Sequence, residues 1–131
     1  MNVKLLTIAA LALEAAAATA TAEAGAGDYE FQAVQAEVKS GAGGDIAVRL
    51  IHRPDGRPVA NAVIFRSRLD MSPEDMGDMT AKLSAEPSRE PGLYRFKAEP
   101  AMAGSWALKL MAKVPGENET VQGTVIVKFK D

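Results

Sequence analysis

The chain has 131 residues, of which 15 are Lys or Arg and 17 are Asp or Glu, so its net charge is -2. This length suits one domain with a modest core, and the near-neutral balance argues against a nucleic-acid-binding protein, which would show a concentrated basic footprint. The absence of cysteine excludes thiolate catalysis and cysteine-ligated zinc or iron–sulfur sites.

The N-terminal segment has the pattern of a secretory leader. A short basic start precedes an apolar run over residues 5–13, and Ala20-Thr-Ala22 is a small-residue cleavage signature. The apolar run is well short of the roughly 20 residues that span a bilayer. We predict a periplasmic protein with no stable membrane span, in which residues 1–22 are a signal peptide cleaved near Ala22 or Ala24 and residues 23–131 form one domain. The alternative is a cytosolic helix.

Short apolar runs punctuated by Gly and Pro make up the rest of the chain. Trp106, Leu108 and Leu110 alternate with polar or small residues, as the side chains of half-buried strands do. Many short, evenly spaced strands with no helical period predict an all-β sandwich. We predict seven strands, at residues 29–38, 45–52, 59–67, 79–86, 92–98, 104–113 and 119–130.

Residues 69–79 lack a strand pattern, and we predict a loop there. This loop holds Met71, Met76 and Met79 among acidic residues. Thioethers prefer soft ions, so three of them in a flexible loop could bind Cu(I) or Ag(I). The alternative is that one or two of these methionines fill the end of the core, because methionine is a flexible core residue.

Met102 and His52 are further candidate ligands. Met102 precedes the 104–113 strand, and it would join the methionine loop if both connections lie at the same end of the sandwich. His52 is the only histidine and ends the 45–52 strand in its inward phase; imidazole is a common copper ligand. The alternatives are ordinary packing for Met102 and a structural role for His52.

Two other large side chains are assigned to no site. We interpret Trp106 as the core anchor of the sandwich, with a cation–π lid over a bound metal as the alternative. Met111 lies on the strand face opposite Trp106 and is expected on the outer face or in a minor cluster. Catalysis has little support, because no serine stands in a nucleophile motif and the carboxylates lack an apolar context. We therefore predict that the protein is not an enzyme.

Several short motifs occur in a characteristic order: Asp55-Gly-Arg-Pro-Val59 with Ala62-Val63, the methionine loop, Pro91-Gly-Leu-Tyr94, and Ala101-Met-Ala-Gly-Ser-Trp106. In this order they resemble the YtkA-like domain, which is related to the FixH-like proteins of bacterial envelopes. The resemblance implies an immunoglobulin-like sandwich that accompanies copper or heavy-metal handling systems, with an efflux adaptor or a copper oxidase as partner. It also implies that the methionine-bearing positions are Met71, Met76, Met79 and Met102. The loop of this chain carries more acids than the compact methionine–glycine run of such relatives.

Two hypotheses follow for the function. The first is a periplasmic accessory protein that binds Cu(I) or Ag(I) through Met71, Met76 and Met79, with Met102 and His52 as further candidates, and passes the ion to an envelope partner. The second is a metal-free interaction module whose methionine loop is an adaptable apolar patch for a protein partner. Sulfurs that converge near solvent favour the first, whereas methionines that are splayed or separately buried favour the second.

Overall fold

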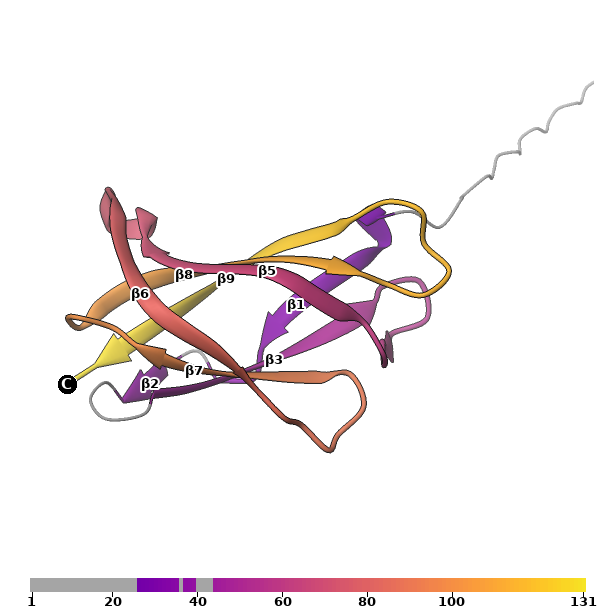
Figure 1. Ribbon diagram of the computed structural model, residues 1–131, viewed down its shortest axis with the longest axis horizontal. Helices are drawn as coiled ribbons and strands as arrows, with labels where there is room; N and C mark the ends of the chain where they lie inside the picture. The colour runs from indigo at the N-terminus through magenta and orange to yellow at the C-terminus, as the bar shows by residue number, and fades with distance from the viewer. Residues whose placement is uncertain (1–25, 36, 40–43) are drawn as a thin grey trace, which may run out of the picture.

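The computed structural model describes residues 26–35, 37–39 and 44–131 (Figure 1). The predicted signal peptide, residues 1–22, lies outside the described residues. No helix within the described part of the chain is long and apolar enough to cross a membrane. The described elements are η2 (Ala26–Asp28), β1 (Tyr29–Ala33), β2 (Glu37–Lys39), β3 (Gly44–His52), β4 (Arg57–Pro58), β5 (Val63–Met71), η3 (Ser72–Glu74), β6 (Met76–Glu86), β7 (Leu93–Glu99), β8 (Gly104–Lys113) and β9 (Val121–Lys130).

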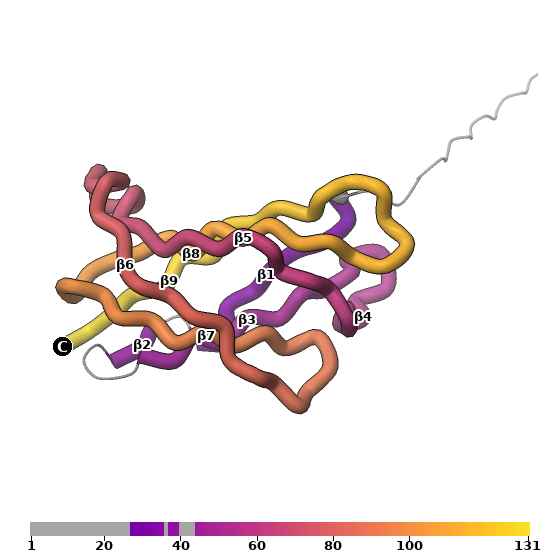
Figure 2. Tube along the Cα trace, in the orientation of Figure 1, coloured from indigo at the N-terminus to yellow at the C-terminus, as the bar shows by residue number. Residues whose placement is uncertain are grey.

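The strands form two layers that are joined through β6 (Figures 1 and 2). One layer has the order β1-β3-β7-β6, with β4 paired to β3, and the other has the order β5-β8-β9-β2. The first half of β6 pairs with β5, whereas residues 82–86 pair with β7. The principal strands therefore have the sheet order of an immunoglobulin constant-type sandwich, whose sheets are ABED and CFG. The predicted all-β, immunoglobulin-like sandwich is confirmed.

The core lies between the two layers and is built by strand alternation. In β8, Trp106, Leu108 and Leu110 are buried while Lys109 is exposed, because successive side chains of a strand point to opposite faces. The Trp106 indole meets the Phe129 ring edge-on, with centroids 6.4 Å apart and planes at 89°, a favoured aromatic geometry. The interpretation of Trp106 as the core anchor is thus correct.

The prediction of a loop over residues 69–79 is wrong. β5 extends to Met71 and β6 begins at Met76, so the tip of this hairpin is only the η3 turn and Asp75. The strand pattern was hidden because Asp70 is a buried charged residue, 1% exposed, between Leu69 and Met71, which are also buried. The predicted strand 29–38 also differs from the structure: β1 pairs with β3 in one layer, whereas β2 pairs in parallel with β9 in the other.

Candidate functional site

The candidate site lies at the tip of the β5–β6 hairpin. Met71 and Met76 are cross-strand partners on either side of the η3 turn. Asp75 adopts a left-handed conformation, with φ 60°, and its N–H donates to the Ser72 carbonyl at 3.0 Å. An Asp tolerates this conformation better than most residues do, so the turn can reverse the chain within a few residues. The tip is therefore a tight, hydrogen-bonded turn.

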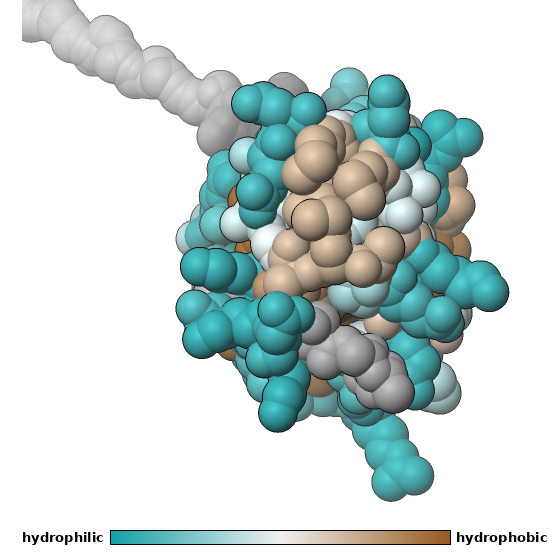
Figure 3. All heavy atoms as spheres, turned by 90° about the vertical axis from the view of Figure 1, so that its left-hand side faces the viewer, coloured by the Kyte–Doolittle hydropathy of each residue, from teal (hydrophilic) through white to brown (hydrophobic). Residues whose placement is uncertain are grey.

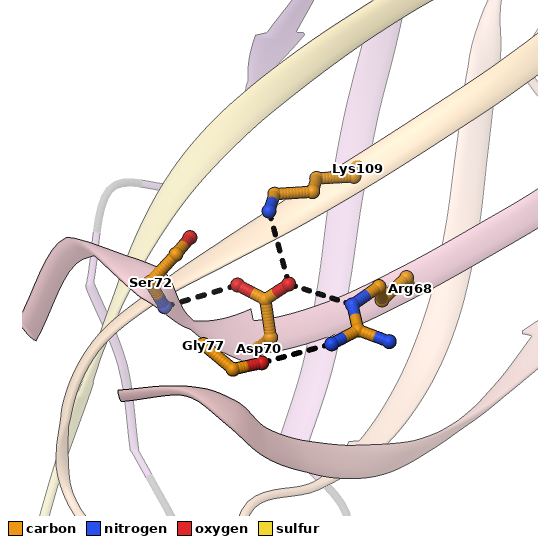
Figure 4. A network of polar contacts seen from close by, with 5 residues as sticks. All are labelled: Arg68, Asp70, Ser72, Gly77 and Lys109. Carbon is orange, nitrogen blue, oxygen red and sulfur yellow. Dashed lines mark hydrogen bonds and ion pairs between the residues drawn. The ribbon is translucent and has the colours of Figure 1, made fainter. Parts of the chain in front are cut away.

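An ionic network around the buried Asp70 carboxylate holds the base of the hairpin tip (Figure 4). The Asp70 carboxylate accepts hydrogen bonds from Arg68 Nε at 2.8 Å and the Ser72 N–H at 3.0 Å, and Lys109 Nζ lies 3.0 Å away. The Arg68 guanidinium also donates to the Gly77 carbonyl at 2.8 Å. Burial alone would raise the pKa of Asp70, but the hydrogen bonds from Ser72, Arg68 and Lys109 outweigh burial and hold this pKa far below its ordinary value. The network joins β5, β6 and β8.

The connection between β7 and β8 packs against the same hairpin tip. The Glu74 carboxylate accepts a hydrogen bond from the Ser105 N–H at 2.6 Å. A Cβ built on Gly104 would lie 2.8 Å from the Met71 methyl carbon, so the Met71 side chain passes directly against the backbone at the start of β8. The β5–β6 and β7–β8 connections therefore lie at the same end of the sandwich. This is the condition under which Met102 was expected to join the methionine loop. This end, formed by the hairpin tip and residues 100–104, is termed the methionine end.

The four candidate methionines differ in their access to solvent. Met71 is fully buried in the core, Met76 and Met79 are partly buried against it, and Met102 is 45% exposed. Figure 3 looks onto this end and shows a moderately hydrophobic patch bordered by hydrophilic atoms. The structure therefore brings the four residues to one end, but it buries Met71 in the core.

His52 lies at the opposite end of the sandwich. β3 begins at Gly44, beside the Phe129 ring and near the start of β8, and His52 follows eight residues later. At about 3.3 Å per residue, this places His52 about 26 Å from Gly44 along the strand, and so at the end opposite the methionine end. Its Nδ1 lies 3.0 Å from Asp55 Oδ1, and its ring lies 5.1 Å from that of Tyr29. The structure thus does not bring His52 together with the methionines.

The hydrogen bond to His52 also shapes the neighbouring turn. This contact, with a further hydrogen bond from the Arg57 N–H, lowers the pKa of Asp55. Asp55 therefore links the end of β3 to the start of β4, a structural role that suits the Pro54-Asp-Gly56 turn. Met111 lies half-buried on the outer face of β8, as its strand phase predicted.

Sequence reasoning missed Asp70 and Glu74 as organising residues of this end. The spacing Arg68-x-Asp70 places both side chains on one strand face, and this was an available signal. No comparable sequence signal pointed to Lys109, because it is distant from Asp70 along the chain. No cluster of three or more His, Asp or Glu side chains that could hold a metal ion occurs among the described residues.

Comparison with known proteins places the chain in a family. No curated protein sequence matches it. Among solved structures, the Lin-41 filamin domain is similar, with 17% identity over 82% of this chain and 94% of that one and a TM-score of 0.43. The ZirS C-terminal domain is also similar, with 9% identity over 96% of this chain and 88% of that one and a TM-score of 0.45. A family model described as YtkA-like matches residues 23–111, which is most of the chain, and the chain therefore belongs to the YtkA-like family.

Proposed function

We propose that this domain is an envelope accessory protein that acts in the periplasm, where it binds Cu(I) or Ag(I) through thioethers at its methionine end and passes the ion to a partner such as an efflux adaptor or a copper oxidase. The observation that carries the proposal is the gathering of Met76, Met79 and Met102, all partly accessible, at one end of a rigid sandwich. Family membership and the secretory pattern of the leader support the location.

The chemistry of the methionine end suits a transferable soft ion. Thioethers are soft, neutral ligands that favour Cu(I) and Ag(I) over zinc or calcium, and they do not form disulfides in an oxidising compartment. Met102 on the β7–β8 connection and Met76 and Met79 on β6 would be the ligands. Met71 is a fourth candidate only if the hairpin tip loosens, because its side chain lies in the core. We leave His52 out of the set, because it lies at the other end of the sandwich.

Acidic side chains near the tip would help cations to approach. Glu74, Asp75 and Asp78 are exposed at or beside the turn, and such a concentration of negative charge raises the local cation concentration. Glu74 is already engaged with the Ser105 N–H. It therefore orders the two connections and is less available as a ligand than its neighbours.

The proposal is tested by titrating residues 23–131 with Cu(I) against a competing chelator. The triple variant Met76→Leu/Met79→Leu/Met102→Leu keeps the apolar volume but removes three sulfurs, and we expect it to bind at least about tenfold more weakly. Met111→Leu is the matched control, because Met111 lies on the outer face of β8, and it should bind like the unchanged protein. Equal affinity of the triple variant and the unchanged protein would overturn the proposal.

Met71 is tested separately because it is buried. If the ion binds at the surface of the methionine end, Met71→Leu should leave the Cu(I) affinity unchanged. A loss equal to that of the triple variant would instead show that the hairpin opens to expose Met71 on binding. Either result defines the ligand set, provided that the triple variant has lost affinity.

A second candidate function is a metal-free interaction module, and the apolar patch in Figure 3 favours it. Exposed apolar surface rimmed by polar residues is typical of protein interaction sites. The two functions predict different results for growth of a deletion strain under copper or silver stress. The triple leucine variant should fail to restore growth if metal is bound, and should restore it if the patch only contacts a protein. Met102→Glu should fail in both cases.

A further inference from the structure

The outer face of the β5-β8-β9 sheet carries an unbalanced positive charge. Although the whole chain has more acidic than basic residues, these three strands contain six cations and one acid, Asp70. All six cations are exposed, which places them on the solvent side of the sheet. They are Arg66, Arg68, Lys109, Lys113, Lys128 and Lys130. Asp70 pairs with Arg68 and Lys109, and Glu37 of the adjacent strand β2 pairs with Lys130 at 3.4 Å. Two acids against six cations leave this face with an excess of positive charge.

Part of this face is hollowed. A shallow depression of about 450 Å³ lies over the middle of the three strands, between Arg66, Arg68 and Lys109 on one side and Gln122 and Thr124 on the other. Strand register arranges these side chains in two rows. Arg68 is paired with Lys109 and Lys109 with Thr124, and one row along, Arg66 is paired with Met111 and Met111 with Gln122. The rows are about 7 Å apart, the distance covered by two residues of a strand.

The sheet itself shows how one row binds a carboxylate. Asp70 is held by Arg68 Nε at 2.8 Å and by Lys109 Nζ at 3.0 Å. Arg66 stands two residues before Arg68 on the same face, and its side chain makes no hydrogen bond or ion pair with any described residue. An exposed arginine offers a planar fork of donors that fits a carboxylate. Arg66 is thus a second cationic side chain on this face, and it has no carboxylate partner among the described residues.

We propose that this depression is a docking site for an acidic segment of a protein partner, which places an Asp or Glu carboxylate against Arg66. The Gln122 amide and the Thr124 hydroxyl can donate to the same carboxylate, and Arg68 and Lys109 add positive charge from the neighbouring row. The site is separate from the methionine end and needs no metal.

A protein segment fits this surface better than an anionic membrane does. The cationic groups line a hollow, which a projecting side chain can enter but a flat lipid surface cannot. Large apolar side chains stand at its margins: Phe65 is 51% exposed and Ile126 is 52% exposed. Lys113 Nζ lies 5.9 Å from the centre of the Phe65 ring. Arginine, methionine and aromatic residues are enriched in protein–protein interfaces, and this face offers all three.

The test measures binding of a fluorescent Glu-Ser repeat peptide to the metal-free domain by anisotropy at low salt, with a Gln-Ser repeat peptide of equal length for comparison. We expect the glutamate peptide to bind and the glutamine peptide not to bind. Arg66→Glu should weaken binding by at least about tenfold, or about 1.4 kcal/mol. Gln122→Glu places an acid in the depression without removing a cation, and it should weaken binding too. Arg68 and Lys109 are left unchanged, because they hold Asp70.

Arg89→Glu is the matched control, because Arg89 is an exposed arginine on the connection between β6 and β7, away from this sheet face. It should bind the glutamate peptide within about twofold of the unchanged protein. The proposal is overturned if the glutamate peptide does not bind, or if Arg66→Glu and Arg89→Glu weaken binding equally. It is also overturned if the peptide fails to bind while phosphatidylglycerol vesicles, or a second copy of the chain, bind in a manner that Arg66→Glu abolishes.

Discussion

The Trp106 indole Nε1 donates a hydrogen bond of 3.1 Å to the backbone carbonyl of Met102. Trp106 is fully buried, whereas Met102 is 45% exposed, so this bond joins the centre of the core to the most exposed of the four candidate methionines. A buried indole N–H needs a partner, and the chain before β8 provides one by folding back over the ring. The position of Met102 is thus set by the core and not by its own side chain.

Replacing Trp106 by Phe should destabilise the protein and release this connection. The variant keeps an aromatic ring but loses the indole donor and leaves a small cavity, so the free energy of unfolding should fall by about 2 kcal/mol. Urea denaturation measures the loss. Met102→Leu is the control: it keeps the backbone carbonyl that accepts the bond, so its stability should be nearly unchanged. A fall as large as that of Trp106→Phe would contradict this account.

Met71 should behave as a core residue in stability measurements. It is fully buried and packs against Gly104, so Met71→Ala should cost about 2–5 kcal/mol of unfolding free energy through lost burial and a cavity. Met71→Leu conserves volume and should cost less than about 1.5 kcal/mol. Met102→Ala removes a half-exposed side chain and should change stability by about 0.5 kcal/mol or less. Similar losses for the two alanine variants would be inconsistent with this packing.

The elements that sequence predicted well are those in which alternation reports burial directly. β8 has its predicted bounds, 104–113, because apolar and polar residues alternate through it and Trp106 points inward. The same reasoning failed at the tip of the β5–β6 hairpin. Asp70 is a charged residue in a buried position, and its charge is tolerated because the Ser72 N–H, Arg68 and Lys109 meet it there. Lys109 lies on another strand, so the pattern along β5 alone could not reveal this.

The sequence predicted that the candidate methionines would lie close together, but it did not predict how deeply each of them is buried. The spacing of Met71, Met76 and Met79 predicted that they would lie close together, and the hairpin register pairs the first two. Their different burial arises from tertiary packing, since Met71 lies beneath the start of β8. The position of His52 depends on strand direction: it ends β3, which starts at the methionine end. Local sequence does not contain that information.

Stability should fall in acid because of Asp70. The pKa of this carboxyl is lowered in the folded protein from its ordinary value of 3.8, so the unfolded chain binds the proton more readily than the folded protein does. The stabilisation is therefore fully present above about pH 5 and is lost as the pH falls below about 4. Urea denaturation at a series of pH values should show this slope, and Asp70→Asn should flatten it.

At neutral pH, Asp70→Asn should itself lower the unfolding free energy by about 1–3 kcal/mol. The amide cannot neutralise Arg68 and Lys109, but these side chains are half exposed, 52% and 44%, so water can hydrate them and the loss stays below that of a fully buried pair. Asp45→Asn is the control, since the only ion pair of Asp45 with a described residue is a long, exposed contact of 3.9 Å with Arg95. It should have an effect near zero; a comparable loss would point to net charge and not to the Asp70 network.

Gly104 allows the methionine end to close, and substituting it should open that end. Its φ is +140°, and an added Cβ would lie 2.7 Å from the Glu74 carboxylate and 2.8 Å from the Met71 methyl carbon. Gly104→Ala therefore has to overcome backbone strain and to displace the ends of the Glu74 and Met71 side chains. Because Met71 is fully buried, the change should cost about 2–4 kcal/mol. Gly116→Ala separates the two causes. Gly116 also has a positive φ, of +89°, but a Cβ there would meet nothing within 4 Å, so only the strain applies and the cost should be about 1–2 kcal/mol.

Thermal or urea unfolding compares the two variants, and amide exchange at Ser105 reports whether its bond to Glu74 has been lost. Equal stability of both variants, with Ser105 still protected, would mean that the hairpin tip does not depend on close approach to Gly104.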